Sequence, residues 1–216
     1  MAGNIEGQVP RWLWNAVVWG LAVVLLAATG LVIGLALGWN DPRPRGSPDW
    51  QAPGLPRILE APIESTVVNL LGYPGGGADA DPAGFILEGI AAAVSGPAFN
   101  GYGLAFHAQD QAHYSVFALG SDGYYAILRV SGEEETPLVT WQQFPHIRRG
   151  REANRPRIEC SNSECSFYIN DEYATTVEED FARQGDFGLW VRSFEAQAVK
   201  AKFSSLGIWA QSAADG

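Results

Sequence analysis

An uninterrupted apolar run near the amino terminus constrains the fold of this chain more than any other feature. From Trp12 to Asn40 no side chain is charged, and most residues are Ala, Val, Leu, Ile or Gly. As a helix this run reaches about 40 Å, more than the roughly 30 Å of bilayer hydrocarbon. It predicts one membrane-spanning helix over residues 12–39. A signal peptide cleaved near Ala36–Gly38 is the alternative, but the run is about twice the usual signal core and almost no basic residue precedes it.

Three glycines recur at every fourth position of the predicted helix. Gly30, Gly34 and Gly38 would share one face, where the backbone of a second helix can approach closely. This pattern predicts helix packing against other transmembrane subunits within the lipid bilayer. The alternative is that glycine is simply common in membrane helices.

Two cysteines bracket a short polar segment. Cys160 and Cys165 are separated by Ser-Asn-Ser-Glu and flanked by two apolar runs, so a hairpin would bring the thiols opposite each other. We expect a disulfide, which persists only in an oxidising compartment. Two buried free thiols are the alternative.

The two indicators of membrane topology disagree. Arg11 precedes the apolar run, whereas Arg43, Arg45 and Arg57 follow it, which leans toward a cytoplasmic carboxyl-terminal side. The expected disulfide instead favours a carboxyl-terminal side outside the cytoplasm, because it needs an oxidising compartment. We therefore predict a single-pass protein of the bacterial inner membrane, with its carboxyl-terminal domain on the periplasmic or extracellular side.

A proline-rich segment separates the apolar run from the rest of the chain. Residues 40–62 contain six prolines, a density that disfavours a regular helix or a central strand. We expect a stiff spacer, or a strap that lies along a protein surface. The predicted organisation is a tail (1–11), the membrane helix (12–39), this linker (40–62), a globular domain (63–210) and a second tail (211–216).

The globular domain has the pattern of an all-β protein. Short apolar and aromatic runs alternate with Gly, Asp and Asn, and Ser121–Gly123 and Asn170–Asp171 are typical turn sequences. We predict an antiparallel two-sheet sandwich. The ten clearest strands are 85–94, 101–108, 114–120, 124–130, 138–144, 157–160, 166–169, 173–177, 186–192 and 200–209.

Four segments carry a resemblance to a known fold family. Gly101–Asp110, Tyr114–Arg129, Ser166–Asp171 and Gly185–Val191 resemble the concanavalin A-like lectin/glucanase jelly roll, particularly its bacterial laminin-G-like and DUF1080-like branch. The resemblance covers residues 63–210 and implies a jelly-roll sandwich. Asn-Asp at 170–171 replaces the usual Asn-Gly of that family, and His107 stands where Arg is frequent.

Catalytic patterns are missing from the sequence. No pair of carboxylates has the spacing of a glycosidase, and the acidic runs Glu133–Glu135 and Glu178–Asp180 are expected to be solvated turns. His107 and His113 flank Asp110, but no third metal ligand is evident. We therefore predict no enzyme activity and no cofactor or metal.

Charge and aromatic content suggest the partners. The net charge of −10 disfavours nucleic acid. A basic patch of Arg148, Arg149, Arg151, Arg155 and Arg157 would suit an acidic neighbour or lipid headgroups, and a solvated loop between strands is the alternative. The aromatic residues that could stack on sugars are Tyr102, Tyr114, Tyr124, Tyr125, Trp141 and Trp190.

The first functional hypothesis is a non-catalytic, membrane-anchored accessory subunit of a larger bacterial membrane complex, such as an electron-transport or photosynthetic assembly. The alternative is a cell-surface carbohydrate-binding module. A glycoside hydrolase would require carboxylates that are distant in the sequence to converge.

Overall fold

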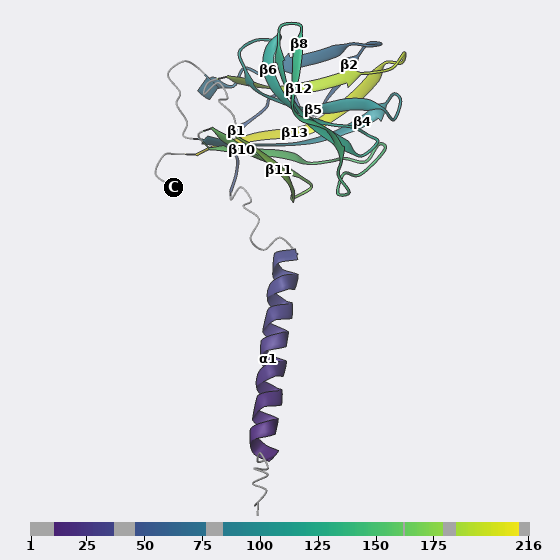
Figure 1. Cartoon of the computed structure of the whole chain (residues 1–216). Coiled ribbons are helices and arrows are strands. Elements are labelled where there is room, and N and C mark those ends of the chain that lie inside the picture. Colours follow the sequence, from purple (N-terminus) through teal and green to yellow (C-terminus); the bar gives the residue numbers. More distant parts are fainter. Residues whose placement is uncertain (1–10, 37–45, 77–83, 162, 179–184, 212–216) are drawn as a thin grey trace, which may run out of the picture. The chain divides into compact units, whose positions relative to one another are not determined.

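The chain forms two separate units, a helix and a β-sandwich. A computed structural model of the chain describes residues 11–36, 46–76, 84–161, 163–178 and 185–211 (Figure 1).

The amino-terminal unit is one long apolar helix. Helix α1 (Arg11–Ala36) contains a stretch, Trp14–Ile33, that is long and apolar enough to cross a membrane. A Cβ atom placed on Gly30 would have no other atom within 4 Å, so no neighbour packs on that glycine in this unit. Gly38 lies outside the described residues, and the predicted role of the three glycines in helix packing stays a prediction.

The described part of the sandwich consists of antiparallel strands and one short 3₁₀ helix. The strands are β1 (Trp50–Gln51), β2 (Arg57–Ala61), β3 (Thr66–Leu70), β4 (Gly84–Ser95), β5 (Asn100–Ala108), β6 (His113–Leu119), β7 (Tyr124–Ser131), β8 (Glu134–Gln143), β9 (Pro156–Ser161), β10 (Glu164–Ile169), β11 (Glu172–Glu178), β12 (Asp186–Ser193) and β13 (Val199–Gln211), and the 3₁₀ helix η1 is Pro74–Gly76.

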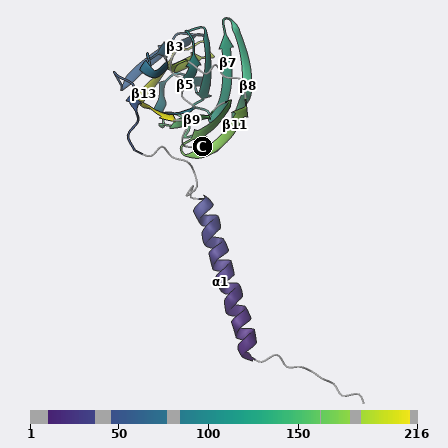
Figure 2. The same ribbon diagram turned by 90° about the vertical axis from the view of Figure 1, so that its left-hand side faces the viewer.

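These strands form two sheets that face each other (Figures 1 and 2). The seven-stranded sheet has the order β1-β13-β4-β9-β10-β11, and β2 pairs with another part of β13. The six-stranded sheet has the order β3-β12-β5-β6-β7-β8. Neighbours that are far apart in the sequence, such as β13 and β4, make this the jelly-roll sandwich that the sequence predicted.

All ten predicted strands are present, but the predicted linker needs correction. Strands β1 and β2 lie within residues 40–62, so part of the proline-rich segment belongs to the sandwich. Pro56 and Pro62 fall immediately outside β2, where their missing N–H groups break no ladder hydrogen bond. Between them, Leu59 and Ala61 are more buried than Ile58 and Glu60, the alternation of an ordinary strand.

The acidic run at Glu133–Glu135 also differs from the prediction. All three side chains are exposed, as expected, but Glu134 and Glu135 belong to strand β8 rather than to a loop. Ser131 pairs with Glu134, which leaves a two-residue turn, and Gly132 adopts a φ of 65° within it.

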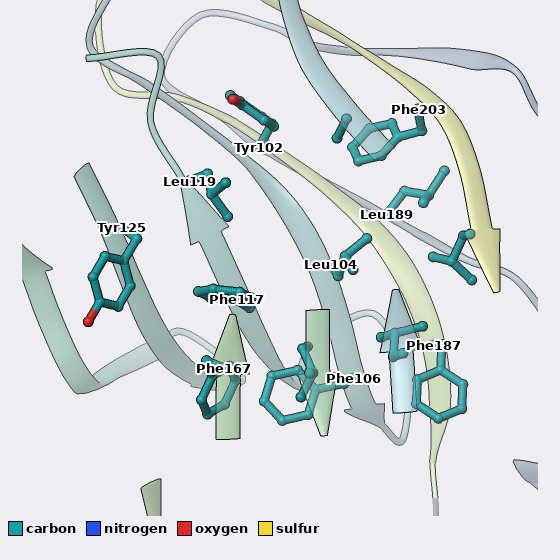
Figure 3. Close-up of a cluster of buried hydrophobic side chains, with 14 of the residues drawn as sticks. Tyr102, Leu104, Phe106, Phe117, Leu119, Tyr125, Phe167, Phe187, Leu189 and Phe203 are labelled. Carbon is teal, nitrogen blue, oxygen red and sulfur yellow. The ribbon is translucent and has the colours of Figure 1, made fainter. Parts of the chain in front are cut away.

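The main core lies between the sheets (Figure 3). Phe106 and Phe117 from the six-stranded sheet each meet Phe167 from the opposite sheet edge to face, with ring centroids 5.9 and 5.1 Å apart. All three rings are fully buried, so aromatic contacts join the sheets at the centre of the sandwich.

The expected disulfide is present. Cys160 on β9 and Cys165 on β10 are direct cross-strand partners, and their sulfur atoms are 1.99 Å apart in the core. Replacing both cysteines with Ala should lower the free energy of unfolding by about 2 kcal/mol, because the unfolded chain regains the freedom that a short closed loop removes. Urea unfolding under oxidising conditions measures this loss. Dithiothreitol should destabilise the unsubstituted protein and leave the double variant unchanged; an equal response of both proteins would contradict the prediction.

Tyr102 makes the stability of the sandwich sensitive to alkaline pH. Burial raises the pKa of its hydroxyl from 10.0 to about 12, although a hydrogen bond from Asn154 opposes the rise. The pKa of the Tyr102 hydroxyl is higher in the folded than in the unfolded chain. Its contribution to the free energy of unfolding is therefore complete below pH 10 and is lost as the pH rises through about 12. As the pH rises through this interval, the free energy of unfolding of Tyr102→Phe should therefore fall by up to about 3 kcal/mol less than that of the unsubstituted protein. Urea titrations at a series of pH values measure the difference, and parallel curves would refute it.

Candidate functional site

The candidate site lies on the outer face of the seven-stranded sheet. Cross-strand pairing sets Glu88, Arg157, Tyr168 and Tyr173 in one row across β4, β9, β10 and β11. Next to these positions, Leu87 on β4, Ile158 on β9, and Phe167 and Ile169 on β10 belong to the core between the sheets. Strand alternation therefore directs this row away from that core.

Arg157 is the centre of the row. Its guanidinium lies over the ring of Tyr168, 4.4 Å from the centroid, and the residue is only 1% exposed. Three carboxylates surround it: Nε is 3.0 Å from Glu159, and Nη1 is 3.9 Å from Glu88 and 3.6 Å from Asp171. A buried cation is stable only with such partners, so Arg157 fixes the positions of the carboxylates around it.

The β10–β11 turn delivers one of these carboxylates. Asn170 and Asp171 have φ values of 57° and 73° and form a two-residue turn between the paired residues Ile169 and Glu172. The turn that the sequence predicted is thus present with Asn-Asp. Asp171 also forms an ion pair with Arg155, a contact that the Gly usual in the resembling family could not make.

A buried asparagine holds the adjoining loop in place. Asn154 is 1% exposed, and its Nδ2 donates hydrogen bonds to the Tyr102 hydroxyl and the Arg148 carbonyl, both at 2.8 Å. Its Oδ1 accepts from Asn170 Nδ2 at 2.8 Å, and Asn170 Oδ1 accepts from the backbone N–H of Arg155 at 2.9 Å. The loop and the β10–β11 turn are therefore fixed to each other.

Hydroxyl groups extend the face toward β11. Ser166 Oγ and Thr176 Oγ1 are 2.8 Å apart, and the Tyr173 hydroxyl donates to Thr176 Oγ1 at 3.0 Å. The ring of Tyr173 is 54% exposed and meets Tyr168 edge to face. An open aromatic ring beside hydroxyl groups is suited to a ligand with both C–H and O–H groups.

We call this set of residues the arginine–tyrosine face. Its members are Glu88, Arg155, Arg157, Glu159, Ser166, Tyr168, Asp171, Tyr173 and Thr176. It combines guanidinium donors, carboxylate acceptors, hydroxyl groups and one open ring, a chemistry that matches a polyhydroxylated ligand.

The outer face of the six-stranded sheet has a different character. Ala105, Val116, Ala118, Ala126 and Trp190 form a second apolar cluster, and all of them are buried. This cluster supplies packing area, and the partly exposed ion pair of Arg192 with Glu135 lies beside it, with the Arg192 guanidinium over the ring of Phe194.

The aromatic residues proposed from the sequence for sugar stacking are mostly buried. Tyr102 and Tyr125 belong to the main core, and Tyr114 and Trp190 to the second cluster. Trp141 is half-buried beside that cluster, and Tyr124 is 38% exposed at the start of β7. The structure does not gather them into one exposed surface.

The structure divides the predicted basic patch, because Arg155 and Arg157 belong to the arginine–tyrosine face while the other three arginines are exposed on a loop. Arg148, Arg149 and Arg151 occupy the loop between β8 and β9, outside the arginine–tyrosine face, and their role stays a prediction.

The two histidines do not form a joint site. His113 pairs with Asp110, with Nδ1 2.9 Å from Oδ1, and hydrogen bonds from Ala112 and His113 lower the pKa of that carboxyl. His107 instead lies near Cys160 and Cys165, whose sulfurs are joined in the disulfide and offer no thiolate to a metal.

The sequence nominated Arg155 and Arg157 as part of the basic patch, but it did not nominate the carboxylates, hydroxyl groups and tyrosines that surround them in the face. The missed signal is alternation within β9, where Arg157 and Glu159 flank the apolar Ile158. Charged residues at every second position of a strand indicate a polar face opposite the core. Glu88, inside the apolar run of β4, carries the same signal.

Comparisons with known proteins support the fold alone. No family model and no curated protein sequence matches the chain. Among solved structures, the carbohydrate-binding module CBM66 from Bacillus subtilis aligns with a TM-score of 0.54 at 12% identity, over 74% of this chain and 94% of the module. A variant of alginate lyase A1-II′ aligns with a TM-score of 0.50 at 12% identity, over 71% of this chain and 79% of the lyase. The chain therefore has the jelly-roll sandwich shared by these proteins.

Proposed function

We propose that the sandwich is a carbohydrate-binding module and that its arginine–tyrosine face holds the glycan. The observation that carries the proposal is the cluster of Arg157, its three carboxylates and the open ring of Tyr173 on one sheet face. Sugars are recognised by charged and hydroxyl groups at their edges and by aromatic rings at their C–H faces. The likeness to a structure named as a carbohydrate-binding module supports this choice.

We further propose that binding is not accompanied by catalysis. Glu88 and Glu159 converge on the face, as a glycoside hydrolase would require. Each carboxylate, however, faces the guanidinium of Arg157, so both take part in the ion pairs of the face.

For the helix we propose an anchoring role. The apolar length of α1 suits a single span, and the disulfide suits an oxidising compartment outside the cytoplasm of a bacterial cell. An intact mass of 23.3 kDa for the protein from native membranes would support retention of the helix, and loss of the first residues would identify a cleaved signal peptide.

The accessory-subunit hypothesis remains a prediction that rests on Gly30, Gly34 and Gly38, on the proline-rich segment and on the absence of catalytic spacing in the sequence. Copurification from membranes in mild detergent tests it, and isolation of the chain without other subunits would contradict it.

Tyr173→Ala should weaken glycan binding about ten-fold, which is about 1.4 kcal/mol of binding free energy, because the exposed ring is lost. Stability should change little, since the side chain is more than half exposed. A glycan array of the full chain identifies ligands. Calorimetric titration with those ligands then measures the affinity of the variant and of the unsubstituted protein.

The matched control is Tyr124→Ala, which removes an exposed tyrosine from the six-stranded sheet and should leave the affinity unchanged. Equal losses in both variants would argue against the arginine–tyrosine face as the binding surface.

A further inference from the structure

From the charges of the arginine–tyrosine face, we infer that its ligand is a neutral sugar and that uronic, sialic and sulfated glycans are excluded. This inference rests on the proposed function and names the substrate class of the same face.

The balance of charge on the face is negative. Three carboxylates, of Glu88, Glu159 and Asp171, surround two guanidinium groups, of Arg155 and Arg157. An anionic substituent placed here would meet three like charges at short range. Repulsion of this kind is a common means of rejecting a wrong ligand.

Both cations of the face are already paired. Arg155 contacts Asp171 and Glu88, and Arg157 contacts those two carboxylates and Glu159. Recognition of an acidic sugar usually requires a guanidinium that can offer two parallel N–H groups to the anion. In this face each guanidinium already faces a carboxylate, and an acidic sugar would have to displace that carboxylate.

Neutral hydroxyl groups fit the same arrangement. The side chain of Arg155 is 40% exposed, so its guanidinium can offer a donor to a sugar oxygen while it keeps its carboxylate partners. The side chains of Glu88 and Asp171 remain about one-fifth exposed and offer acceptors to sugar O–H groups. One hydroxyl group can accept from the guanidinium and donate to a carboxylate at the same time.

The three exposed arginines of the predicted basic patch lie on the loop that adjoins the face. Arg148, Arg149 and Arg151 are exposed in the β8–β9 loop and form no part of the face. Binding of an acidic glycan at that loop can therefore be distinguished by replacing all three arginines with Ala.

The test uses the full chain in detergent and matched pairs of oligosaccharides. Neutral gluco-, galacto-, manno- and fructo-oligosaccharides are compared by calorimetry with uronate or sulfated counterparts of equal length. In each pair that shows binding, the neutral oligosaccharide should bind at least ten-fold more tightly than its acidic counterpart. Its affinity should be nearly constant between about 50 and 500 mM salt, because no ligand charge is screened.

A charge variant adds a second readout. Glu88→Gln keeps the size of the side chain and removes one negative charge, so the preference for the neutral member should decrease severalfold. The triple arginine variant should keep the preference of the unsubstituted protein.

Each result decides a different question. Equal or tighter binding of the acidic member, retained in the triple arginine variant, overturns the inference and leaves glycan binding intact. If no oligosaccharide binds while a known lectin on the same array does, the proposed function fails and the inference fails with it.

Discussion

Replacing Arg157 with Met should lower the free energy of unfolding by about 3–5 kcal/mol and abolish glycan binding. Arg157 is 1% exposed and is the shared partner of Glu88, Glu159 and Asp171. Without it, three carboxylates would face one another with only Arg155 between them. The loss arises mainly from this uncompensated charge, since Met nearly restores the packing volume.

The matched control is Arg192→Met. Arg192 also pairs with a carboxylate, that of Glu135, but the two side chains are 29% and 36% exposed. Ion pairs in contact with water contribute about 0–1 kcal/mol, so this variant should remain close to the unsubstituted protein. Urea unfolding of both variants at neutral pH provides the comparison, and similar losses would show that burial does not determine the effect.

A second substitution separates charge from shape. Adding Glu159→Gln to Arg157→Met removes one of the unpaired carboxylates and should recover part of the lost stability. Glycan binding should remain absent, because the remaining carboxylates still lack the cation that fixes their positions. Recovery of binding in the double variant would contradict the role assigned to Arg157.

Local sequence patterns were sufficient to predict the fold class, because turns and strand alternation are decided by nearby residues. Asn170–Asp171 predicted the β10–β11 turn, since both residues tolerate positive φ values. The spacing of Cys160 and Cys165 predicted the disulfide for a similar reason. Strand β2 was missed because its flanking prolines outweighed the alternation between them, and only pairing with β13 makes it a strand.

The candidate site depends on contacts that no local pattern contains. Glu88 and Arg157 are neighbours because β4 pairs with β9, which is far away in the sequence. The register of β9 with β10 then places Arg157 opposite Tyr168. The sequence showed charged and aromatic residues in these strands, but the strand order that unites them is set by packing of the entire sandwich.

Trp190→Ala should also lower the free energy of unfolding by about 3–5 kcal/mol. Unlike Arg157→Met, it should leave glycan binding intact. Trp190 is 1% exposed in the apolar cluster on the outer face of the six-stranded sheet. A Cβ atom on Gly101 would come within 2.6 Å of its ring, which shows how closely the indole covers the β5 backbone. Removal of the ring leaves a cavity that the surrounding strands cannot fill.

Glycan affinity separates the two sheet faces in this variant. Trp190 lies on the six-stranded sheet, and the arginine–tyrosine face lies on the other one, so folded Trp190→Ala should bind with unchanged affinity. Trp141→Ala is the control for the cluster, because Trp141 is only partly buried and its loss should cost less stability. A ten-fold loss of affinity in Trp190→Ala, measured at a temperature where the variant is fully folded, would move the glycan to the six-stranded sheet. Unchanged affinity would instead show that this large aromatic ring serves packing and that glycan binding does not depend on it.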